Sequence, residues 1–312
     1  MIRQELIQLS IGNPGRKVQS KVIRLNCHAV AGMRMPSKGS QGAAAFMANE
    51  LLIKQRSFGR TMRRDAWWAQ PLLAFLGLST FVIYSTWAAL QGNHYTAGPY
   101  LSPFYSPELL GSSPHAWFGP QPGWWPGWLP FSPALLILWA PGLFRLTCYY
   151  YRGAYYKAFW ADPPSCTVGE PRQSYLGEQS FPLILQNAHR YFLYIALIFL
   201  VLLATDVWKA MWFADAVTGQ KRFGIGVGTL ILGANVVLLS GYAFGCHSLR
   251  HLIGGFSDRL SQAPVRQRAY QCINCFNRRH MVWAWMSLFS VGFCDLYIRL
   301  CSLGIWTDWR IL

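Results

Sequence analysis

Five stretches of this chain are long and apolar enough to cross a membrane. They are residues 66–90, 130–151, 191–213, 223–245 and 281–303. The hydrocarbon core of a bilayer is about 30 Å thick, which a helix of roughly 20 apolar residues spans. Backbone polar groups in lipid must be bonded within their own segment, so each stretch is expected to be a helix. The sequence therefore predicts an all-α, integral membrane bundle of five transmembrane helices.

The composition agrees with a lipid environment. Hydrophobic residues make up 53% of the 312 residues and charged residues only 13%, against roughly 25% charged residues in soluble domains. So few charges leave too little polar surface for most soluble enzymes. The long uncharged stretches also argue against nucleic-acid binding, which needs cationic residues spread over a folded polar face. The eight cysteines are scattered and do not suggest a disulfide framework.

The basic residues are distributed unequally between the two sides of the predicted bundle. Of 28 Lys and Arg residues, 23 lie before residue 66, within 145–190 or within 250–279. Positively charged flanks of membrane spans stay in the cytoplasm. We therefore predict a multi-pass protein of the plasma membrane, with a cytoplasmic amino terminus and an external carboxyl terminus.

Two segments outside the spans differ in composition. The predicted external loop, 91–129, has no Lys or Arg and is rich in Trp, Tyr, Pro and Gly, which suits an interfacial aromatic belt. Residues 1–46 are basic and have no apolar period. They are either a disordered extension or a stretch upstream of a start at Met47, and they show no signal-peptide pattern. The predicted division is thus an extension, 1–46, and a five-helix membrane domain, 47–312.

Two features inside the spans predict how the helices pack. Gly224, Gly226 and Gly228 begin the fourth span without the strand and acidic residue of a dinucleotide-binding fingerprint. Small residues let neighbouring backbones approach in lipid, so close helix packing is expected there. Asp295 and Arg299 are four residues apart in the last span and share one helix face. We expect them to form an ion pair in the outer half of the membrane.

The histidines and cysteines gather on the predicted cytoplasmic side. Six fall at the ends of four different spans, and three more lie in the loops of the same side. They are Cys148, His189, Cys246, His247, His251 and His280 at the span ends, and Cys166, Cys272 and Cys275 in the loops. Helix ends that meet in a bundle can each supply one ligand to a common site. Each residue taken alone is more typical of an interfacial or structural role, but the pattern of all of them together predicts a metal centre.

Mixed Cys and His ligands favour iron–sulfur or zinc chemistry. Two Cys on one iron and two His on the other make a Rieske-type [2Fe-2S] centre, whereas zinc also accepts two Cys and two His. Heme b instead needs two His that face each other across the bundle. His247 and His251 share one helix face. A single Cys272-x-x-Cys275 pair is a weak indication of a metal site.

Four motifs resemble the membrane-anchor subunit of an actinobacterial-type succinate dehydrogenase. They are TCYYYR from Thr147, FPLILQNAHRYF from Phe181, CHSLRH from Cys246 and RHM from Arg279, in order within about residues 60–303. The resemblance implies a five-helix protein that holds a flavoprotein and an iron–sulfur subunit at the cytoplasmic face. It has no succinate site, and so no catalytic residue, of its own. One branch of the family carries a Rieske-type cluster in place of heme, with a quinone site nearby.

The resemblance favours this Rieske-type branch. The first span has no His, and the second has Cys148 where di-heme relatives have His. One ligand from each of four helices is implied, with Cys148 and Cys246 on one iron and His189 and His280 on the other. The substitutes are His247 and His251 for the imidazoles and Cys272 and Cys275 for the thiolates. The alternatives are a di-heme b anchor or, from another class, a transporter or scaffold whose Cys and His bind zinc or nothing.

A quinone site is expected within electron-transfer reach of the metal centre. It needs polar groups for the quinone carbonyls and aromatic walls. The candidate contacts are Arg152, Tyr155, Tyr156, Arg190 and Arg250. Each of them can also be an ordinary interfacial residue, and both menaquinone and ubiquinone fit the expectation.

Overall fold

The computed structural model describes residues 57–128, 130–171, 179–181, 183–215, 218–255 and 259–312. The predicted extension, 1–46, lies outside the described residues. Within them the chain is mostly helical, as the apolar stretches predict, with two small antiparallel two-stranded sheets.

Four helices of the described part are long and apolar enough to cross a membrane. They are α2 (Ala69–Gln91), α6 (His189–Lys209), α7 (Val227–Phe244) and α10 (His280–Ser302). Large apolar side chains are exposed along their outer faces, for example Leu73, Ile198 and Val237. Apolar surface of this extent is stable against lipid and unstable against water. The chain is therefore a membrane protein.

The predicted span over 130–151 is not one continuous helix. Its residues form α3 (Pro133–Ile137) and α4 (Trp139–Leu146), and α5 (Tyr149–Phe159) begins after a break. Pro141 cannot donate a helical hydrogen bond, and Cys148 has an extended backbone with ψ 128°. Residues 133–146 cover about 21 Å at 1.5 Å per residue, less than the thickness of the apolar core. The stretch 130–151 would be the fifth membrane-spanning helix, so the count of five stays a prediction.

The bounds of two other predicted spans differ from the bounds of the helices that the structure contains. The spans predicted over 191–213 and 223–245 each overlap with one strand of a hairpin. β3 (Trp212–Ala214) pairs with β4 (Lys221–Phe223), so α6 ends earlier and α7 begins later than predicted. Apolar content alone does not distinguish these strand residues from the helices beside them.

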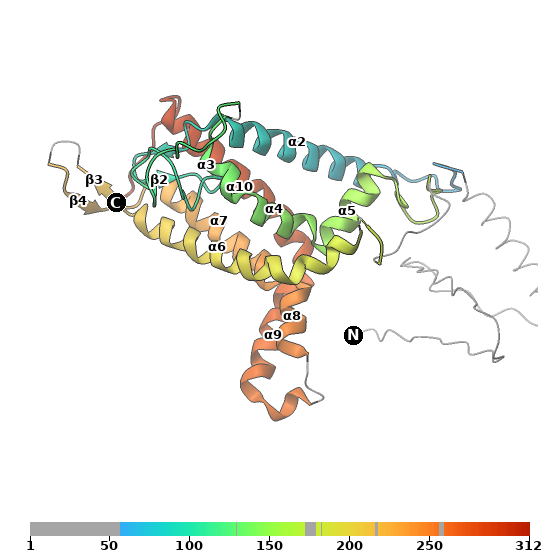
Figure 1. Cartoon of the computed structure of the whole chain (residues 1–312). Helices are drawn as coiled ribbons and strands as arrows, with labels where there is room; N and C mark the ends of the chain where they lie inside the picture. Colours follow the sequence, from blue (N-terminus) through green and yellow to red (C-terminus); the bar gives the residue numbers. More distant parts are fainter. Residues whose placement is uncertain (1–56, 129, 172–178, 182, 216–217, 256–258) are drawn as a thin grey trace, which may run out of the picture. The chain divides into compact units, whose positions relative to one another are not determined.

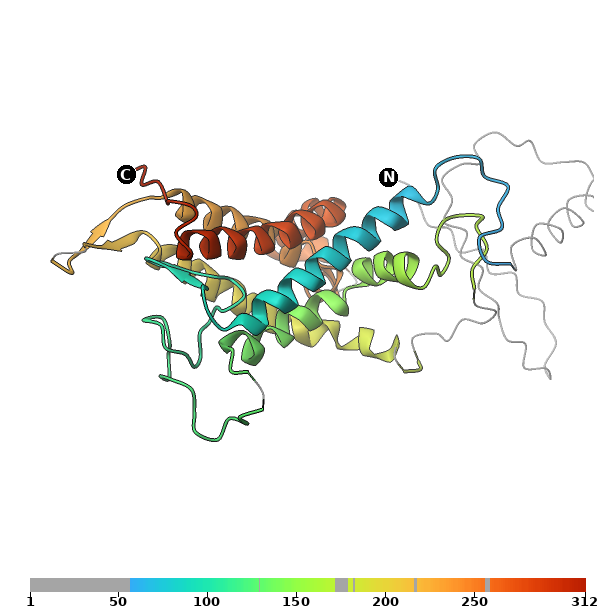
Figure 2. The same ribbon diagram turned by 90° about the horizontal axis from the view of Figure 1, so that it is seen from above.

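The helices form an antiparallel bundle (Figures 1 and 2). α10 packs against α7 and α2, and α6 packs against α7 and α4. α2, α6 and α10 begin at the end where α4 and α7 finish, which we call the His189 end. The carboxyl terminus and the β3–β4 hairpin lie at the opposite, C-terminal end. The cytoplasmic placement of the His189 end stays a prediction.

Two further helices leave the bundle at the His189 end. α8 (His247–Gly254) and α9 (Pro264–Arg278) extend across the direction of the long helices as a helical hairpin (Figure 1). Arg250 Nε donates to the Tyr270 hydroxyl oxygen over 3.1 Å, and Arg266 donates to the carbonyl of Ile253. Cys272 and Cys275, expected in a loop, lie on α9 and are exposed. Most of the predicted loop therefore consists of two helices, which we call the α8–α9 hairpin.

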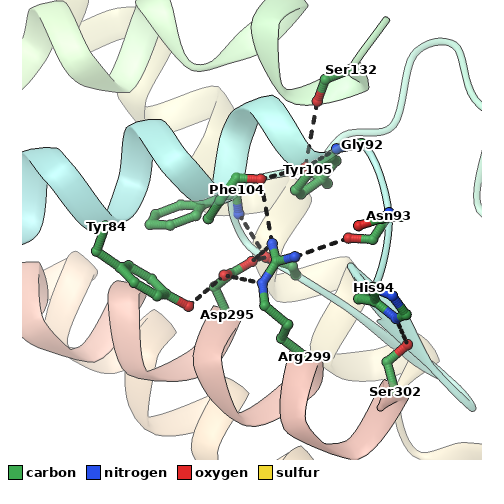
Figure 3. Close-up of polar contacts among 12 residues, drawn as sticks. Tyr84, Gly92, Asn93, His94, Phe104, Tyr105, Ser132, Asp295, Arg299 and Ser302 are labelled. Carbon is green, nitrogen blue, oxygen red and sulfur yellow. Dashed lines mark hydrogen bonds and ion pairs between the residues drawn. The ribbon is translucent and has the colours of Figure 1, made fainter. Parts of the chain in front are cut away.

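A buried polar cluster joins α2, the following loop and α10 at the C-terminal end (Figure 3). Arg299 Nε lies 3.2 Å from Asp295 Oδ2, which confirms the predicted ion pair. Tyr84 and Ser102 donate to the two Asp295 oxygens over 2.7 and 2.5 Å, and Arg299 also donates to the Asn93 carbonyl. Both charges therefore have hydrogen-bonding partners besides each other, as the burial of an ion pair requires.

The loop between α2 and α3 folds back over the same end. β1 (Thr96–Ala97) pairs with β2 (Tyr100–Leu101), and the side chains of Tyr105 and Glu108 are completely buried. Trp124 and Trp128 are exposed by 72% and 82%. Exposed Trp side chains can contact the membrane–water interface. The aromatic belt itself stays a prediction.

The glycines at the start of α7 are closely packed, but their neighbour is not a helix. A Cβ on Gly228 would lie 2.7 Å from the ring of Tyr100 in β2, and one on Gly224 would lie 2.8 Å from the Leu312 carbonyl oxygen. The close approach is confirmed, and the expectation of a helix as partner was wrong. Helix–helix contact over a glycine occurs at Gly241, where a Cβ would lie 2.6 Å from the Trp283 ring of α10.

Candidate metal centre

One cavity of about 200 Å³ lies where four helix ends meet at the His189 end, and it is partly open, because the exposed residues Tyr149, Asn187 and His247 also line it. All four preferred ligands, Cys148, His189, Cys246 and His280, line it. Cys148 precedes α5, His189 begins α6, Cys246 separates α7 from α8, and His280 begins α10. We call this space the Cys–His cavity. Tertiary packing thus brings together residues from four different segments.

The four side chains form two Cys–His pairs. His189 Nε2 lies 3.1 Å from Cys246 Sγ, and His280 Nε2 lies 3.7 Å from Cys148 Sγ. None of the four side chains is more than 8% exposed. In the described part of the chain, no three His, Cys, Asp or Glu side chains come close enough together to hold one metal ion. The contacts that the structure does contain are pairwise.

Thr147 determines which nitrogen of His189 faces the cavity. The Thr147 hydroxyl donates its single hydrogen to the Leu143 carbonyl over 2.7 Å. Its oxygen, 3.0 Å from His189 Nδ1, therefore accepts the Nδ1 hydrogen. The His189 ring also stacks on Phe144, with the planes 2° apart. A neutral His189 thus presents an unprotonated Nε2 towards the Cys246 sulfur, as a ligand nitrogen requires.

His280 is held mainly by aromatic contacts. Its ring stacks on Tyr242 at a centroid distance of 5.1 Å and meets the edge of Tyr150 at 6.4 Å. His280 Nδ1 is buried and has no hydrogen-bond partner in the described part of the chain. The His280 ring thus has one buried nitrogen, Nδ1, without a partner among the described residues, and its other nitrogen, Nε2, lies beside the Cys148 thiol. This arrangement suits a metal ligand.

The surroundings of Cys246 and His247 favour the uncharged forms of these two side chains. Burial raises the pKa of the Cys246 thiol to about 11, although Sγ accepts a 3.4 Å hydrogen bond from the Ser248 backbone N–H. Burial, followed by the positive charge of Arg250, lowers the pKa of His247. A metal that binds here would thus displace the thiol proton and find neutral imidazole.

Of the substitute ligands, one lines the Cys–His cavity. His247 lines it, with its ring centroid 6.2 Å from that of His280. His251 lies one turn further along α8 and is exposed. Cys272 and Cys275 are exposed on α9 and lie outside the cavity lining.

Of the five quinone candidates, only Arg152 lines the cavity. It is 9% exposed, and its guanidinium carbon lies 4.6 Å from the centroid of the Tyr149 ring. Arg250 bonds to Tyr270 in the α8–α9 hairpin, and Arg190 is exposed. Tyr155 donates to the Leu146 carbonyl over 3.1 Å, and its ring lies 5.0 Å from that of Tyr156. The structure does not gather these five residues at one place.

Two residues next to the cavity were not singled out from the sequence. Arg145 lies inside an apolar stretch and donates to the Tyr151 hydroxyl and to Ser287 Oγ over 2.6 and 3.0 Å. Tyr242 is 2% exposed, and its hydroxyl has no hydrogen-bond partner in the described part of the chain. A charge at membrane depth is itself a functional signal, and could have pointed to Arg145. Nothing in the sequence distinguishes Tyr242 from other tyrosines.

These features define a class: a helical integral membrane protein with two thiols and two imidazoles buried at one end of the bundle. The chain belongs to the family described as actinobacterial succinate dehydrogenase subunit SdhC, whose sequence model matches residues 69–304. It is thus a membrane-anchor subunit of an actinobacterial succinate dehydrogenase.

A solved structure agrees with this assignment. The chain is similar to one in the structure described as the Mycobacterium smegmatis Sdh1 complex in the apo form. The two are 42% identical, with a TM-score of 0.73, over 81% of this chain and 94% of that chain. The comparison with curated proteins finds no match.

Proposed function

We propose that this chain relays electrons from a partner iron–sulfur subunit to membrane quinone through a Rieske-type [2Fe-2S] cluster held in the Cys–His cavity. The observation that carries the proposal is the convergence of two Cys and two His, from four helix ends, on one cavity, with all four side chains buried. In this proposal the chain has no succinate-oxidising site of its own.

The donor set fits the proposed group. Cys148 and Cys246 would supply thiolates, and His189 and His280 would supply ring nitrogens. Mixed Cys and His ligation gives such a centre a higher reduction potential than all-Cys ligation. The chain's own residues do the positioning: Thr147 fixes the His189 tautomer, and the rings of Phe144 and Tyr242 stack on those of His189 and His280.

Electron entry is proposed at the His189 end, where the cavity lies. Flavoprotein and iron–sulfur subunits are proposed to dock there, on the cytoplasmic side of the membrane. Membership of the SdhC family and the similarity to a chain of an Sdh1 complex support association with other Sdh subunits. Exposed Arg268, Arg278 and Arg279 give the α8–α9 hairpin a cationic surface, which suits an acidic partner.

Electron paramagnetic resonance of the purified complex tests the proposal. Poised at successive potentials, the complex is expected to show a centre between about −150 and +300 mV, the range of Rieske-type clusters. A reduced-minus-oxidised heme b band would instead support the di-heme alternative. Zinc, or no metal beyond that of the partner subunits, would support a scaffold.

Variants of the ligands provide the second test. The double variant His189→Ala, His280→Ala is expected to lose the Rieske-type signal and quinone reduction, while succinate oxidation by a soluble artificial acceptor continues. Cys294→Ser is the matched control, because Cys294 is completely buried but lies on α10 away from the cavity lining. Quinone reduction that survives in the double variant would show that the ligand assignment is wrong.

A further inference from the structure

The α8–α9 hairpin leaves the bundle across the direction of the long helices (Figure 1). Because the long helices are the ones that cross the bilayer, a hairpin across their direction runs along the membrane surface. It joins the spans directly: α9 ends at Arg278, and α10 begins at His280. The hairpin therefore lies close to the level where the acyl chains of the lipid meet the head groups.

One side of α9 is apolar. Its residues follow one another at intervals of four, three and four positions, which places them on one face of a helix. They are Val265, Ala269, Cys272 and Phe276, which we call the apolar stripe. Val265 is 82% exposed, and Cys272 is exposed as well. An exposed apolar face on a basic helix is typical of helices that lie in a membrane interface.

The opposite side of α9 is polar. Its residues repeat at the same intervals two positions further along, a rotation of about 200° around the helix axis. They are Gln267, Gln271, Asn274 and Arg278, which we call the polar side. A third side faces α8, where Arg266 donates to the Ile253 carbonyl and the Asn277 amide donates to the Gly245 carbonyl over 2.7 Å. The helix thus separates apolar from polar residues, as a membrane interface requires.

The contact between Phe276 and Trp283 shows that the apolar stripe faces the membrane. The centroids of the two rings lie 6.0 Å apart. Trp283 belongs to the first turn of α10, which runs from His280 into the bundle, so it lies on the membrane side of the hairpin. Its neighbours Met281 and Val282 are 52% and 49% exposed. The apolar stripe is therefore continuous with the lipid-facing surface of α10.

An open groove lies beside the stripe, at the end of the hairpin away from the bundle. Both helices contribute apolar side chains to its lining, among them Leu252, Ile253, Val265 and Ala269. Arg266 also lines the groove, and its guanidinium donates to the backbone carbonyls of Ile253 and Gly255. An acyl chain is apolar and flexible, so it fits such a groove without leaving a polar group unpaired.

We propose that the α8–α9 hairpin lies in the membrane interface and binds an anionic phospholipid, with an acyl chain in this groove and the phosphate at Arg268. Arg268 is exposed and follows Val265 by three residues, so it lies at the edge of the apolar stripe. From an edge position, the long Arg side chain reaches the head groups while its helix contacts the acyl chains. Arg278, on the polar side, faces away from the lipid. The continuity of the stripe with α10 favours lipid over a soluble partner.

Spin labels on the assembled complex in nanodiscs of phosphatidylcholine and phosphatidylglycerol test the orientation of α9. Val265→Cys and Gln271→Cys are compared in a Cys272→Ser, Cys275→Ser background, and the signal of that background alone is subtracted. Oxygen concentrates in lipid, so we expect it to relax the label at position 265 more strongly than the label at position 271. A water-soluble nickel chelate is expected to show the reverse order.

Two results of this measurement overturn the proposal. If the nickel chelate reaches both labels equally, the hairpin lies in water. If neither reagent reaches the label at position 265, a protein subunit covers the apolar stripe.

Phospholipid that stays bound to the detergent-washed complex tests the phosphate contact. The wild type is expected to retain phosphatidylglycerol in preference to phosphatidylcholine. Arg268→Gln is expected to lower the retained phosphatidylglycerol about fivefold, the usual effect of one basic residue near a lipid surface. Arg278→Gln is the matched control, because Arg278 is an exposed arginine on the polar side of the same helix, and is expected to retain the wild-type amount per copy of this chain. Equal retention in the two variants, or no preference in the wild type, overturns the lipid site.

Discussion

The imidazole ring of His280 stacks on the phenol ring of Tyr242, with centroids 5.1 Å apart and planes 17° apart. Tyr242 also meets the edges of Phe144 and Tyr151 at 5.3 and 5.9 Å. The ring is therefore enclosed on several sides, and its packing fixes where His280 can lie.

This enclosure predicts different results for two Tyr242 variants. Tyr242→Phe keeps the ring and removes a buried hydroxyl that has no partner in the described part of the chain, so stability is expected to change by less than about 1 kcal/mol or to rise. Tyr242→Ala leaves a cavity and is expected to cost about 3–5 kcal/mol. Thermal unfolding of the detergent-solubilised complex measures both. A loss above about 1 kcal/mol in Tyr242→Phe would mean that the hydroxyl is hydrogen-bonded in the complex.

The Asp295–Arg299 pair predicts a strong asymmetry between single and double replacements. Arg299→Leu leaves the buried Asp295 carboxylate unpaired and is expected to destabilise the protein by about 3–5 kcal/mol. Asp295→Asn with Arg299→Leu removes both charges and is expected to recover most of this loss. Unfolding temperature and membrane yield are the measurements. Equal losses in the single and double variants would contradict the prediction.

The contact between α7 and α10 predicts the effect of a methyl group at Gly241. Gly241→Ala places a Cβ 2.6 Å from the Trp283 ring and is expected to cost about 1–3 kcal/mol, because the helices must separate or the ring must move. Gly153→Ala on α5 meets no atom within 4 Å and is expected to gain about 0.5–1 kcal/mol from helix propensity. Unfolding midpoints of the two variants test the difference. If the unfolding midpoint of Gly241→Ala equals that of Gly153→Ala, the close packing at Gly241 does not contribute to stability.

The cationic α8–α9 hairpin predicts a defect in assembly. Arg268→Glu with Arg278→Glu reverses two exposed charges and is expected to reduce co-purification of the soluble Sdh subunits, most strongly at low salt. Arg222→Glu, an exposed change in β4 at the other end of the bundle, serves as control and is expected to have no effect. If the wild type, the double variant and Arg222→Glu all recover equal amounts of the soluble subunits, docking does not use the α8–α9 hairpin.

Much of the fold could be predicted from local sequence. Apolar stretches of about 20 residues predict α2, α6, α7 and α10, because lipid requires helices whose backbone groups are bonded internally. The i, i+4 spacing predicts the Asp295–Arg299 pair for an equally local reason. The break at Thr147 and Cys148, and the β3–β4 hairpin, were not predicted, since an apolar run does not reveal where a helix within it stops.

For the candidate site as well, some features could be predicted from the sequence and others could not. Residue types and their positions along the chain are enough to predict which side chains have ligand chemistry and that these side chains fall at the ends of helices. The sequence does not predict which of them share one cavity, which they do at Cys148, His189, Cys246 and His280 but not at His251, Cys272 and Cys275. Nor does it predict that Arg145 and Tyr242 lie close to this cavity, because such neighbours come from contacts between α4, α6, α7 and α10. Such contacts depend on how the helices rotate and pack against one another, which hydrophobicity along a single segment does not specify.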